Sequence, residues 1–430
     1  MSILKRIEKR NEWATVGIQL ANTNTKGKGA AAAKKTKLTL TKNMRIENNV
    51  SDFMDKIKTA DGGELVMLKE LKGTFGFPFL TRCGGVQWFT KMIVYNLDTD
   101  NEDICREVSI EEYDDLSAAE RRVFHDKLQR LPNHSANTED YIQAQLTQLV
   151  LQHVTPHVCM LYGTTVLGEP KHKDMIQKYI DKYKRRYKDE YVDMAKVIMT
   201  EWADQGDLDE YIRDHKESWT IETWQALLFQ MCAMLALIQE KIPSFRHNDL
   251  SLANILVQKT ETEGGGGGGG YYKYVIGGKE YFVPDIGFRV LMADFDYASI
   301  EAMGVTNEKL DTKTTRKFGT VPHKNASFDC QMMLNWLNLW TLKLNKFKTY
   351  GGPDCDTLFR VKEFIDSALD KEKYQGDNNR WLRYSRLRFG KKEIPELVPR
   401  YILETNAFFD PFRQQAPATP EAILLEQYNI

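Results

Sequence analysis

Two segments of the 430-residue chain combine polar residues that could carry out phosphoryl transfer. In residues 247–257, Asp249 and Asn254 lie five positions apart, directly before an apolar run typical of a strand. In the second segment, an apolar run over residues 291–293 leads to the carboxylate of Asp294. Phosphoryl transfer needs a carboxylate that orients the attacking hydroxyl and oxygen ligands that hold Mg²⁺ against the phosphates. The pattern predicts Asp249 in the first role, and Asn254 with Asp294 in the second.

The elements that must position these residues come in an order of strands first and helices later. Strand-like runs occur at residues 64–68, 77–81, 86–94, 197–201 and 288–292, and a hairpin is expected over 271–283. Helix-like runs occur at residues 117–131, from the capping residue Thr138 to Pro156, at 208–212 and 220–240, and after 328. This order predicts an α+β fold with two lobes.

Composition excludes several classes of protein. The chain has 59 Lys and Arg against 60 Asp and Glu, so its net charge of −1 argues against a protein that works by bulk attraction to nucleic acid. The six cysteines form no CxxC pair, which argues against a zinc ribbon or a disulfide scaffold. We expect no membrane-spanning segment, because no run reaches the length of about 18 apolar residues. A cytoplasmic protein is the simplest interpretation.

Two regions carry concentrated positive charge. Residues 1–45 hold eleven Lys and Arg against two acids, which predicts a flexible basic segment, with contact to a polyanion or nucleic acid as the alternative. Residues 168–193 are rich in Lys, Arg and Tyr, which predicts a charged surface helix or a docking surface. Seven consecutive glycines, residues 264–270, indicate a linker.

The first two segments resemble motifs of the protein kinase superfamily. His247-Asn248-Asp249-Leu250, with Asn254, is similar to the catalytic loop H-R-D-L-x-x-x-N, and Asp294-Phe295-Asp296 resembles the metal-binding D-F-G. The long insertion and the short activation segment resemble the divergent serine/threonine kinases of large DNA viruses. The resemblance implies transfer of the γ-phosphate of ATP to protein Ser or Thr, with Mg²⁺ or Mn²⁺, in the host cytoplasm or the virion.

The resemblance also implies a phosphate-binding site upstream. Gly73, Phe75 and Gly76 resemble the later half of the glycine-rich loop, and Lys91 stands where the family places its phosphate-binding lysine. Lys69 is a rival, but it precedes the glycines. Glutamate from the following helix would position Lys91. Glu139 is the expected partner, with Asp140 and Gln143 as alternatives.

The adenine site is expected at the link between the lobes. By resemblance, Thr200 is the gatekeeper residue, and the backbone of Glu201, Trp202 and Ala203 bonds the adenine. Asp329 resembles the buried aspartate that braces the catalytic loop, but an aspartate before an apolar helix is also an ordinary cap.

Several family residues are replaced. Asn248 stands in place of the arginine that reads an activation-loop phosphate, which leads to the hypothesis that loop phosphorylation is not the on-switch. Ser251 replaces the lysine that contacts the transferring phosphate. The first loop glycine is Leu71, Phe89 replaces a small residue facing adenine, and Asp296 replaces the last glycine of D-F-G.

Two other functions fit part of the pattern. A small-molecule phosphotransferase of the aminoglycoside or choline kinase type has similar loops, including an aspartate two residues after the metal aspartate. A catalytically inactive scaffold would explain the missing arginine, lysine and glycines. The expected organisation is a basic segment at 1–45, an N-lobe at 46–199 and a C-lobe at 200–430 with an insertion at 258–287.

Overall fold

A computed structural model describes the fold, and the chain divides into two compact units. The described residues are 2–11, 77–83, 86–97, 113, 115–131, 133–168, 173, 174, 176, 177, 180, 181, 190–260, 270–307, 310, 326–344, 355–369, 395–413 and 423–429. The first unit in our description, the sheet unit, comprises Arg6–Asp140 and Met160–Trp202. The second, the helical unit, comprises Met1–Lys5, Tyr141–Cys159 and Ala203–Ile430. Residues 141–159 thus group with the C-terminal part of the chain. The sequence analysis placed them in the N-lobe, because it expected one boundary between the lobes at residue 200.

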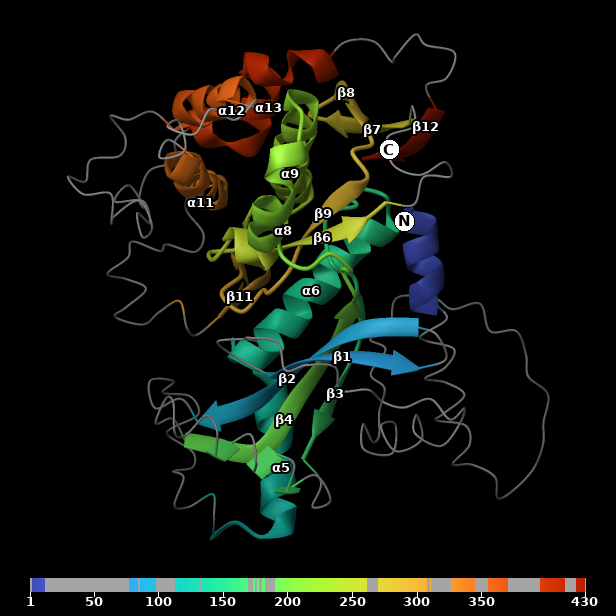
Figure 1. The fold of residues 1–430 in the computed structure, drawn as a ribbon. Coiled ribbons are helices and arrows are strands. Elements are labelled where there is room, and N and C mark those ends of the chain that lie inside the picture. Colours follow the sequence, from blue (N-terminus) through green and yellow to red (C-terminus); the bar gives the residue numbers. More distant parts are fainter. Residues whose placement is uncertain are drawn as a thin grey trace. The chain divides into compact units, whose positions relative to one another are not determined.

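An antiparallel sheet organises the sheet unit (Figure 1). Its strands run in the order β1-β2-β4-β3. They are β1 (Phe77–Cys83), β2 (Val86–Leu97), β3 (Leu161–Leu167) and β4 (Glu190–Glu201). The expected strands at 77–81, 86–94 and 197–201 are confirmed, and β3 was not expected. The expected strand at 64–68 lies outside the described residues.

Helix α5 (Ala118–Arg130) covers part of this sheet. Ser117 caps it reciprocally with Glu120, in a capping box. Its buried Phe124 and Leu128 pack in one cluster with Tyr95 and Ile198. The apolar face of α5 therefore packs against the two inner strands of the sheet, β2 and β4.

Helix α6 (Ser135–Leu151) begins three residues before the expected cap, so the assignment of Thr138 as a capping residue is wrong. The carbonyl of His134 accepts the backbone N–H groups of Asn137 and Thr138, both at 2.9 Å. The Thr138 hydroxyl donates to the same carbonyl at 3.1 Å. A threonine inside a first turn can make this bond to its own helix, and the sequence pattern does not distinguish it from a cap.

Helix α9 (Ile221–Lys241) is the centre of the helical unit. Thr220 caps it, and all its side chains from Trp224 to Ile238 are buried. By length and composition α9 could cross a membrane, but 83% of its most apolar window is buried inside the protein, as in the core helix of a folded domain. The expected helix at 220–240 is confirmed.

Strands β6 (Ile255–Lys259) and β9 (Phe288–Met292) form an antiparallel pair. On the other side of β9, the Met292 N–H donates to the His157 carbonyl at 2.9 Å, and the Cys159 N–H donates to the Met292 carbonyl at 3.1 Å. This contact explains why residues 141–159 belong to the helical unit. It also fixes both edges of the strand that leads to Asp294.

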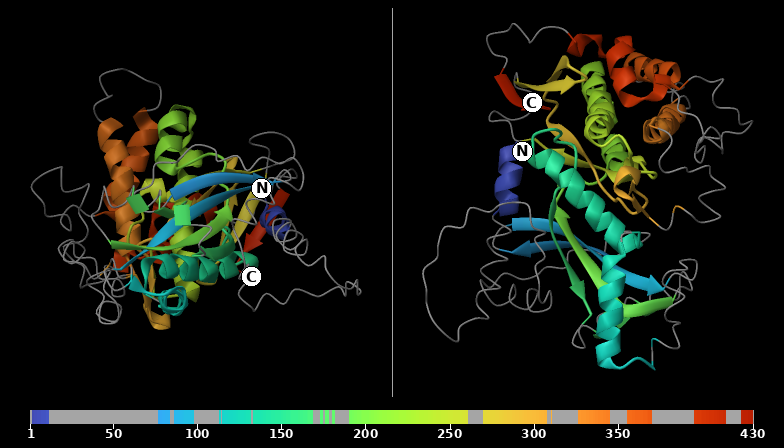
Figure 2. Two further views of the ribbon diagram at one scale, coloured as in Figure 1. Left: turned by 90° about the horizontal axis from the view of Figure 1, so that it is seen from below. Right: turned by 180° about the vertical axis from the view of Figure 1, so that it is seen from behind.

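The expected hairpin is present as β7 (Gly270–Ile276) and β8 (Lys279–Pro284). The turn residues Gly277 and Gly278 both have positive φ angles, 59° and 77°, which suit glycine. A third strand, β12 (Ile423–Tyr428), pairs in parallel with β7 (Figures 1 and 2). The purely helical pattern expected after residue 328 is therefore wrong at this strand.

The remaining elements of the helical unit surround α9. The helices are α8 (Leu208–His215), α11 (Phe328–Leu344), α12 (Cys355–Ala368) and α13 (Pro399–Thr405). Short strands β5 (Phe245–Arg246), β10 (Ser299–Ile300) and β11 (Val305–Thr306) form a small sheet beside the loop at 247–254. The α+β fold expected from the sequence is confirmed.

Residues 3–11 form a helix, which we call the N-terminal helix (Figure 1). The expectation of a flexible segment over 1–45 is wrong for these residues, because Ile3, Arg6 and Arg10 are buried. Residues 12–45, the glycine linker up to residue 269 and most of 168–193 lie outside the described residues.

Candidate active site

The loop between β5 and β6 is held by a buried carboxylate. Asp329 in α11 accepts the His247 N–H at 2.7 Å and the Asn248 N–H at 2.8 Å, one on each oxygen. Its side chain is fully buried. Of the two roles considered for Asp329, the structure therefore shows the brace. Paired charge-assisted bonds of this kind fix the backbone that leads to Asp249.

Asp249 and Asn254 lie in contact. The Asn254 side-chain amide donates to the Asp249 carbonyl at 2.6 Å and to its carboxylate at 3.2 Å. A short 3-10 turn over Leu252–Asn254 folds the chain back, and the Ser251 N–H also donates to the Asp249 carbonyl at 2.8 Å. The five-residue spacing thus places both side chains at one point of the loop.

Asp294 lies beside this pair at the end of β9. The β6–β9 ladder pairs Ile255 with Met292, and the Ala293 N–H continues it by donating to the Asn254 carbonyl at 3.0 Å. Asp294 is exposed, with a φ angle of 62°. A non-glycine residue in this left-handed region is uncommon and often marks a functional site.

The donor set of Asn254 and Asp294 suits a magnesium ion. Asn254 turns its amide nitrogen to Asp249, so its amide oxygen, the atom that ligates Mg²⁺, faces away from that bond. The carboxylate of Asp294, an exposed residue, would supply the second oxygen ligand. Mg²⁺ in nucleotide sites is commonly bound by one or two such groups together with substrate phosphates. These residues therefore fit the metal expected from the sequence.

The sheet unit holds a buried ion pair between Lys91 of β2 and Glu139 of α6. The Lys91 Nζ lies 3.0 Å and 2.9 Å from the two carboxylate oxygens of Glu139. Both side chains are more than nine-tenths buried. A buried lysine is costly to ionise without such a partner. The pairing expected from the sequence is thus present within this unit.

The two alternatives to Glu139 have other partners. The Asp140 carboxylate lies 2.6 Å from the Lys196 Nζ of β4. The Gln143 amide donates to the Cys159 carbonyl at 2.9 Å. Of the three candidates, Glu139 is therefore the one paired with Lys91. Lys69, the rival to Lys91, lies outside the described residues.

The residues expected to bind adenine lie at the end of β4 and directly after it. Thr200 is buried and pairs across the sheet with Phe89. Glu201 ends the strand, and its side chain bonds Arg6. Trp202 is half-buried, and in the helical unit Ala203 packs in a cluster with Cys159 and Leu291. The expected phosphate-loop residues Gly73, Phe75 and Gly76 lie outside the described residues.

Two replaced positions have local structural roles. The Asn248 side chain donates to the Tyr297 carbonyl at 2.9 Å and to the Ser299 hydroxyl at 3.2 Å, with a φ angle of 64°. Asp296 is buried, and its carbonyl accepts the Asn307 amide at 2.6 Å. Asn248 therefore ties the loop to the segment after Asp294 instead of presenting a cation.

Three positioning contacts were missed by the sequence analysis. Gln230 of α9 accepts the Val290 N–H at 3.1 Å and so supports β9. Lys196 interrupts an apolar strand, which is a recognisable signal of a buried pair. Arg6 lies in a run of basic residues that resembles a solvated tail, and nothing in that pattern distinguishes it.

Comparison with known proteins points to one family. The sequence model of the family described as protein tyrosine and serine/threonine kinase matches residues 188–263. The chain is similar to the protein kinases. The matched kinase segment includes β4, Glu201, the loop at 247–254 and β6, whereas Lys91, Glu139 and Asp294 lie outside it.

One relative extends the kinase similarity over more of the chain. A protein of Acanthamoeba polyphaga mimivirus named "Putative serine/threonine-protein kinase R400" is 28% identical over 320 residues. The aligned region covers 68% of this chain and 64% of the relative, so the match spans about two thirds of each protein. The similarity to kinases of large DNA viruses agrees with the sequence analysis.

Proposed function

We propose that this protein is a serine/threonine protein kinase, which transfers the γ-phosphate of ATP to hydroxyl groups of protein substrates. The observation that carries the proposal is the hydrogen-bonded pair of Asp249 and Asn254, beside Asp294 at the end of β9. The family match over residues 188–263 and the viral relative support the same function.

The residues of the helical unit have distinct roles in this proposal. Asp249 orients the substrate hydroxyl for in-line attack and accepts its proton, while the bond from Asn254 holds the carboxylate in place. Asn254 and Asp294 hold Mg²⁺, or Mn²⁺. The bound metal neutralises charge that develops on the phosphates. Asp329 keeps the loop backbone rigid, so that the positions of these oxygens are preorganised.

In the sheet unit, Lys91 would contact the nucleotide phosphates. Glu139 holds the Lys91 ammonium in one position through both carboxylate oxygens. Catalysis of phosphoryl transfer depends mainly on positioning and on charge neutralisation, with little covalent chemistry for the protein to perform. In the proposed function, Lys91 of the sheet unit supplies charge neutralisation, and Asp249, Asn254 and Asp294 of the helical unit supply positioning and metal ligands.

The test is transfer of labelled γ-phosphate from ATP with Mg²⁺, with wild type beside Asp249→Asn. Casein, a basic protein and aminoglycosides serve as acceptors. Asp214→Asn is the matched control, because Asp214 is an exposed aspartate on α8 outside the site. We expect label on protein Ser or Thr with wild type and the control, and a loss of about 10³-fold or more with Asp249→Asn.

Each other outcome would overturn the proposal or the role given to Asp249. Label on an aminoglycoside alone would show a small-molecule phosphotransferase. No label on any acceptor, with ATP still bound, would show an inactive nucleotide-binding scaffold. Full activity of Asp249→Asn would exclude Asp249 as the residue that orients the hydroxyl.

A further inference from the structure

The N-terminal helix contributes a buried arginine to the end of strand β4. Arg6 Nε lies 2.7 Å from one carboxylate oxygen of Glu201, and Arg6 Nη2 lies 2.7 Å from the other. Both side chains are almost fully removed from solvent, at 0% and 2% exposure. Paired bonds between the planar guanidinium and carboxylate groups restrict the orientation of both.

Glu201 also connects to the start of β3. Its carboxylate accepts the Met160 N–H at 3.3 Å, and its own N–H donates to the Met160 carbonyl at 2.8 Å. A second arginine of the helix, Arg10, donates to the Leu161 carbonyl at 2.8 Å. Arg6 and Arg10 therefore both attach the N-terminal helix to the place where β3 begins and β4 ends.

Stability alone does not explain an ion pair at this place. The desolvation of two charges offsets most of their attraction, and a well-packed apolar pair is often as stable or more stable. What a buried bidentate pair supplies is a fixed geometry. Here that geometry is imposed on Glu201, directly before Trp202.

We infer that Arg6 is a positioning residue for nucleotide recognition, which acts through Glu201 and fixes the backbone that bonds the adenine. The inference rests on the proposed function, in which the chain after Thr200 binds ATP. It also gives two of the basic residues of segment 1–45 a role inside the fold. Arg6 and Arg10 are buried against the protein, so neither presents its charge to a polyanion.

The test measures equilibrium binding of Mg-ATP and Mg-GTP to full-length variants. Arg6→Leu combined with Glu201→Leu removes the pair without leaving one charge buried alone. We expect this double variant to lose affinity for ATP about tenfold, the loss typical of one well-made hydrogen bond, with little change for GTP. The preference for ATP over GTP then falls, because a misplaced backbone discriminates less strongly between adenine and guanine.

Two further variants separate positioning from simple folding support. Arg6→Lys keeps the charge but loses the paired geometry, so its ATP affinity should lie between wild type and the double variant. Lys9→Leu is the matched control, because Lys9 is an exposed cation on the same helix. Its ATP and GTP affinities should equal those of wild type.

Unchanged ATP preference in the double variant would overturn the inference, and so would an equal loss for ATP and GTP, which would indicate general damage. Because the measurement is of binding, it does not depend on turnover. A wild type that binds ATP but transfers no phosphate would defeat the proposed function and leave this test intact.

Discussion

At the scale of single residues, the Lys91–Glu139 pair can be tested directly by one substitution. Glu139 is 3% exposed and bonds the Lys91 ammonium through both oxygens. Replacing Glu139 by Gln keeps the side-chain volume but removes the negative charge. Lys91 then loses the group that would hold it in position for the phosphates in the proposed function.

We predict that Glu139→Gln lowers kcat/KM by about 10²-fold, similar to the loss of one preorganised electrostatic group. Steady-state kinetics at varied ATP would measure it. Glu120→Gln is the control, since Glu120 is an exposed residue of α5 whose bonds are confined to its own cap. Equal activity of Glu139→Gln and wild type would contradict a role for this pair in catalysis.

Asn248 shows how a replaced residue can change regulation. A cation at this position would be available to an activation-loop phosphate, but the Asn248 amide instead bonds the Tyr297 carbonyl and the Ser299 hydroxyl. The loop is thus tied to the following segment by neutral hydrogen bonds. This contact supports the hypothesis that loop phosphorylation is not the on-switch.

At the scale of elements, the start of helix α6 has its own fixed contacts in the sheet unit. Besides the Lys196–Asp140 pair, the side-chain amide oxygen of Asn137 accepts the Tyr95 hydroxyl at 2.6 Å. The Asn137 amide also bonds the carbonyls of Leu128 and Leu131, at 2.8 Å and 2.9 Å. Glu139 therefore lies on a turn that is held by several buried polar contacts.

Because these contacts need no phosphate, we predict that activity survives loss of the five threonines in residues 306–320. The variant replaces Thr306, Thr312, Thr314, Thr315 and Thr320 by Ala. Phosphate transfer to a protein substrate should stay within about threefold of wild type, a change below 1 kcal/mol in the barrier. Collapse of activity, restored by Asp or Glu at one position, would show a phosphorylation switch.

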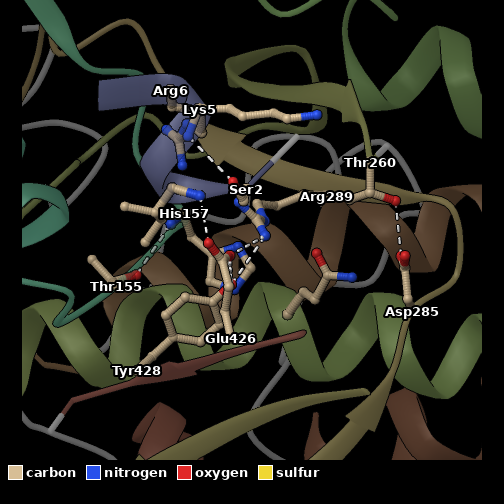
Figure 3. A network of polar contacts seen from close by, with 12 residues as sticks. Ser2, Lys5, Arg6, Thr155, His157, Thr260, Asp285, Arg289, Glu426 and Tyr428 are labelled. Atoms are coloured by element: carbon tan, nitrogen blue, oxygen red, sulfur yellow. Dashed lines mark hydrogen bonds and ion pairs between the residues drawn. The ribbon is translucent and has the colours of Figure 1, made fainter. Parts of the chain in front are cut away.

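Strand β12 provides a second test at this scale (Figure 3). Glu426 Oε2 lies 3.0 Å from Arg289 Nη2 of β9 and accepts the Tyr428 hydroxyl at 2.6 Å. Arg289 is almost fully buried, at 3% side-chain exposure. The polar network thus joins β12 to β9, the strand that leads to Asp294. Arg289 lies five residues before Asp294 in the sequence.

We predict that Glu426→Gln lowers the free energy of unfolding by about 3 kcal/mol, because Arg289 keeps its charge but loses its buried counter-charge. Urea denaturation would measure the loss. Glu280→Gln is the control: Glu280 is half-exposed and pairs with Lys273, so its loss should cost less than about 1 kcal/mol. An equal loss of unfolding free energy in Glu426→Gln and Glu280→Gln would contradict the prediction that the buried ion pair contributes more than the exposed one.

At the scale of the whole molecule, nucleotide binding should appear as a gain in stability. A ligand that binds only the folded state stabilises it by mass action, by about 2.7 kcal/mol at a concentration 100 times its dissociation constant. We predict that Mg-ATP raises Tm of wild type more than ATP with a chelator. Differential scanning calorimetry would measure the difference.

Asp294→Ala should abolish that difference, because it removes a carboxylate that would hold the metal in the proposed function. The variant should fold, since Asp294 is exposed. Asp214→Asn should keep the full metal-dependent shift. A metal-dependent shift of wild-type size in Asp294→Ala would place the metal on other residues.

Local sequence patterns determined the parts of the protein in which the interacting residues are close together along the chain. Asp249 and Asn254 lie on one tight turn, and their five-residue spacing was enough to identify both as candidate site residues. The hairpin of β7 and β8 and the buried helix α9 followed from turn residues and apolar periodicity in the same way. Glu139 was expected from the resemblance to the kinase family, with Asp140 and Gln143 as alternatives, and the structure pairs Glu139 with Lys91.

The tertiary structure decided the contacts between residues far apart in the sequence. Arg6 bonds a residue 195 positions later, and β12 pairs with a strand about 150 positions earlier. Neither contact has a local signature, because an arginine in a basic run and a short apolar segment fit many environments equally well. Which environment they occupy depends on burial and on the pairing of charges, and these exist only once the chain has folded.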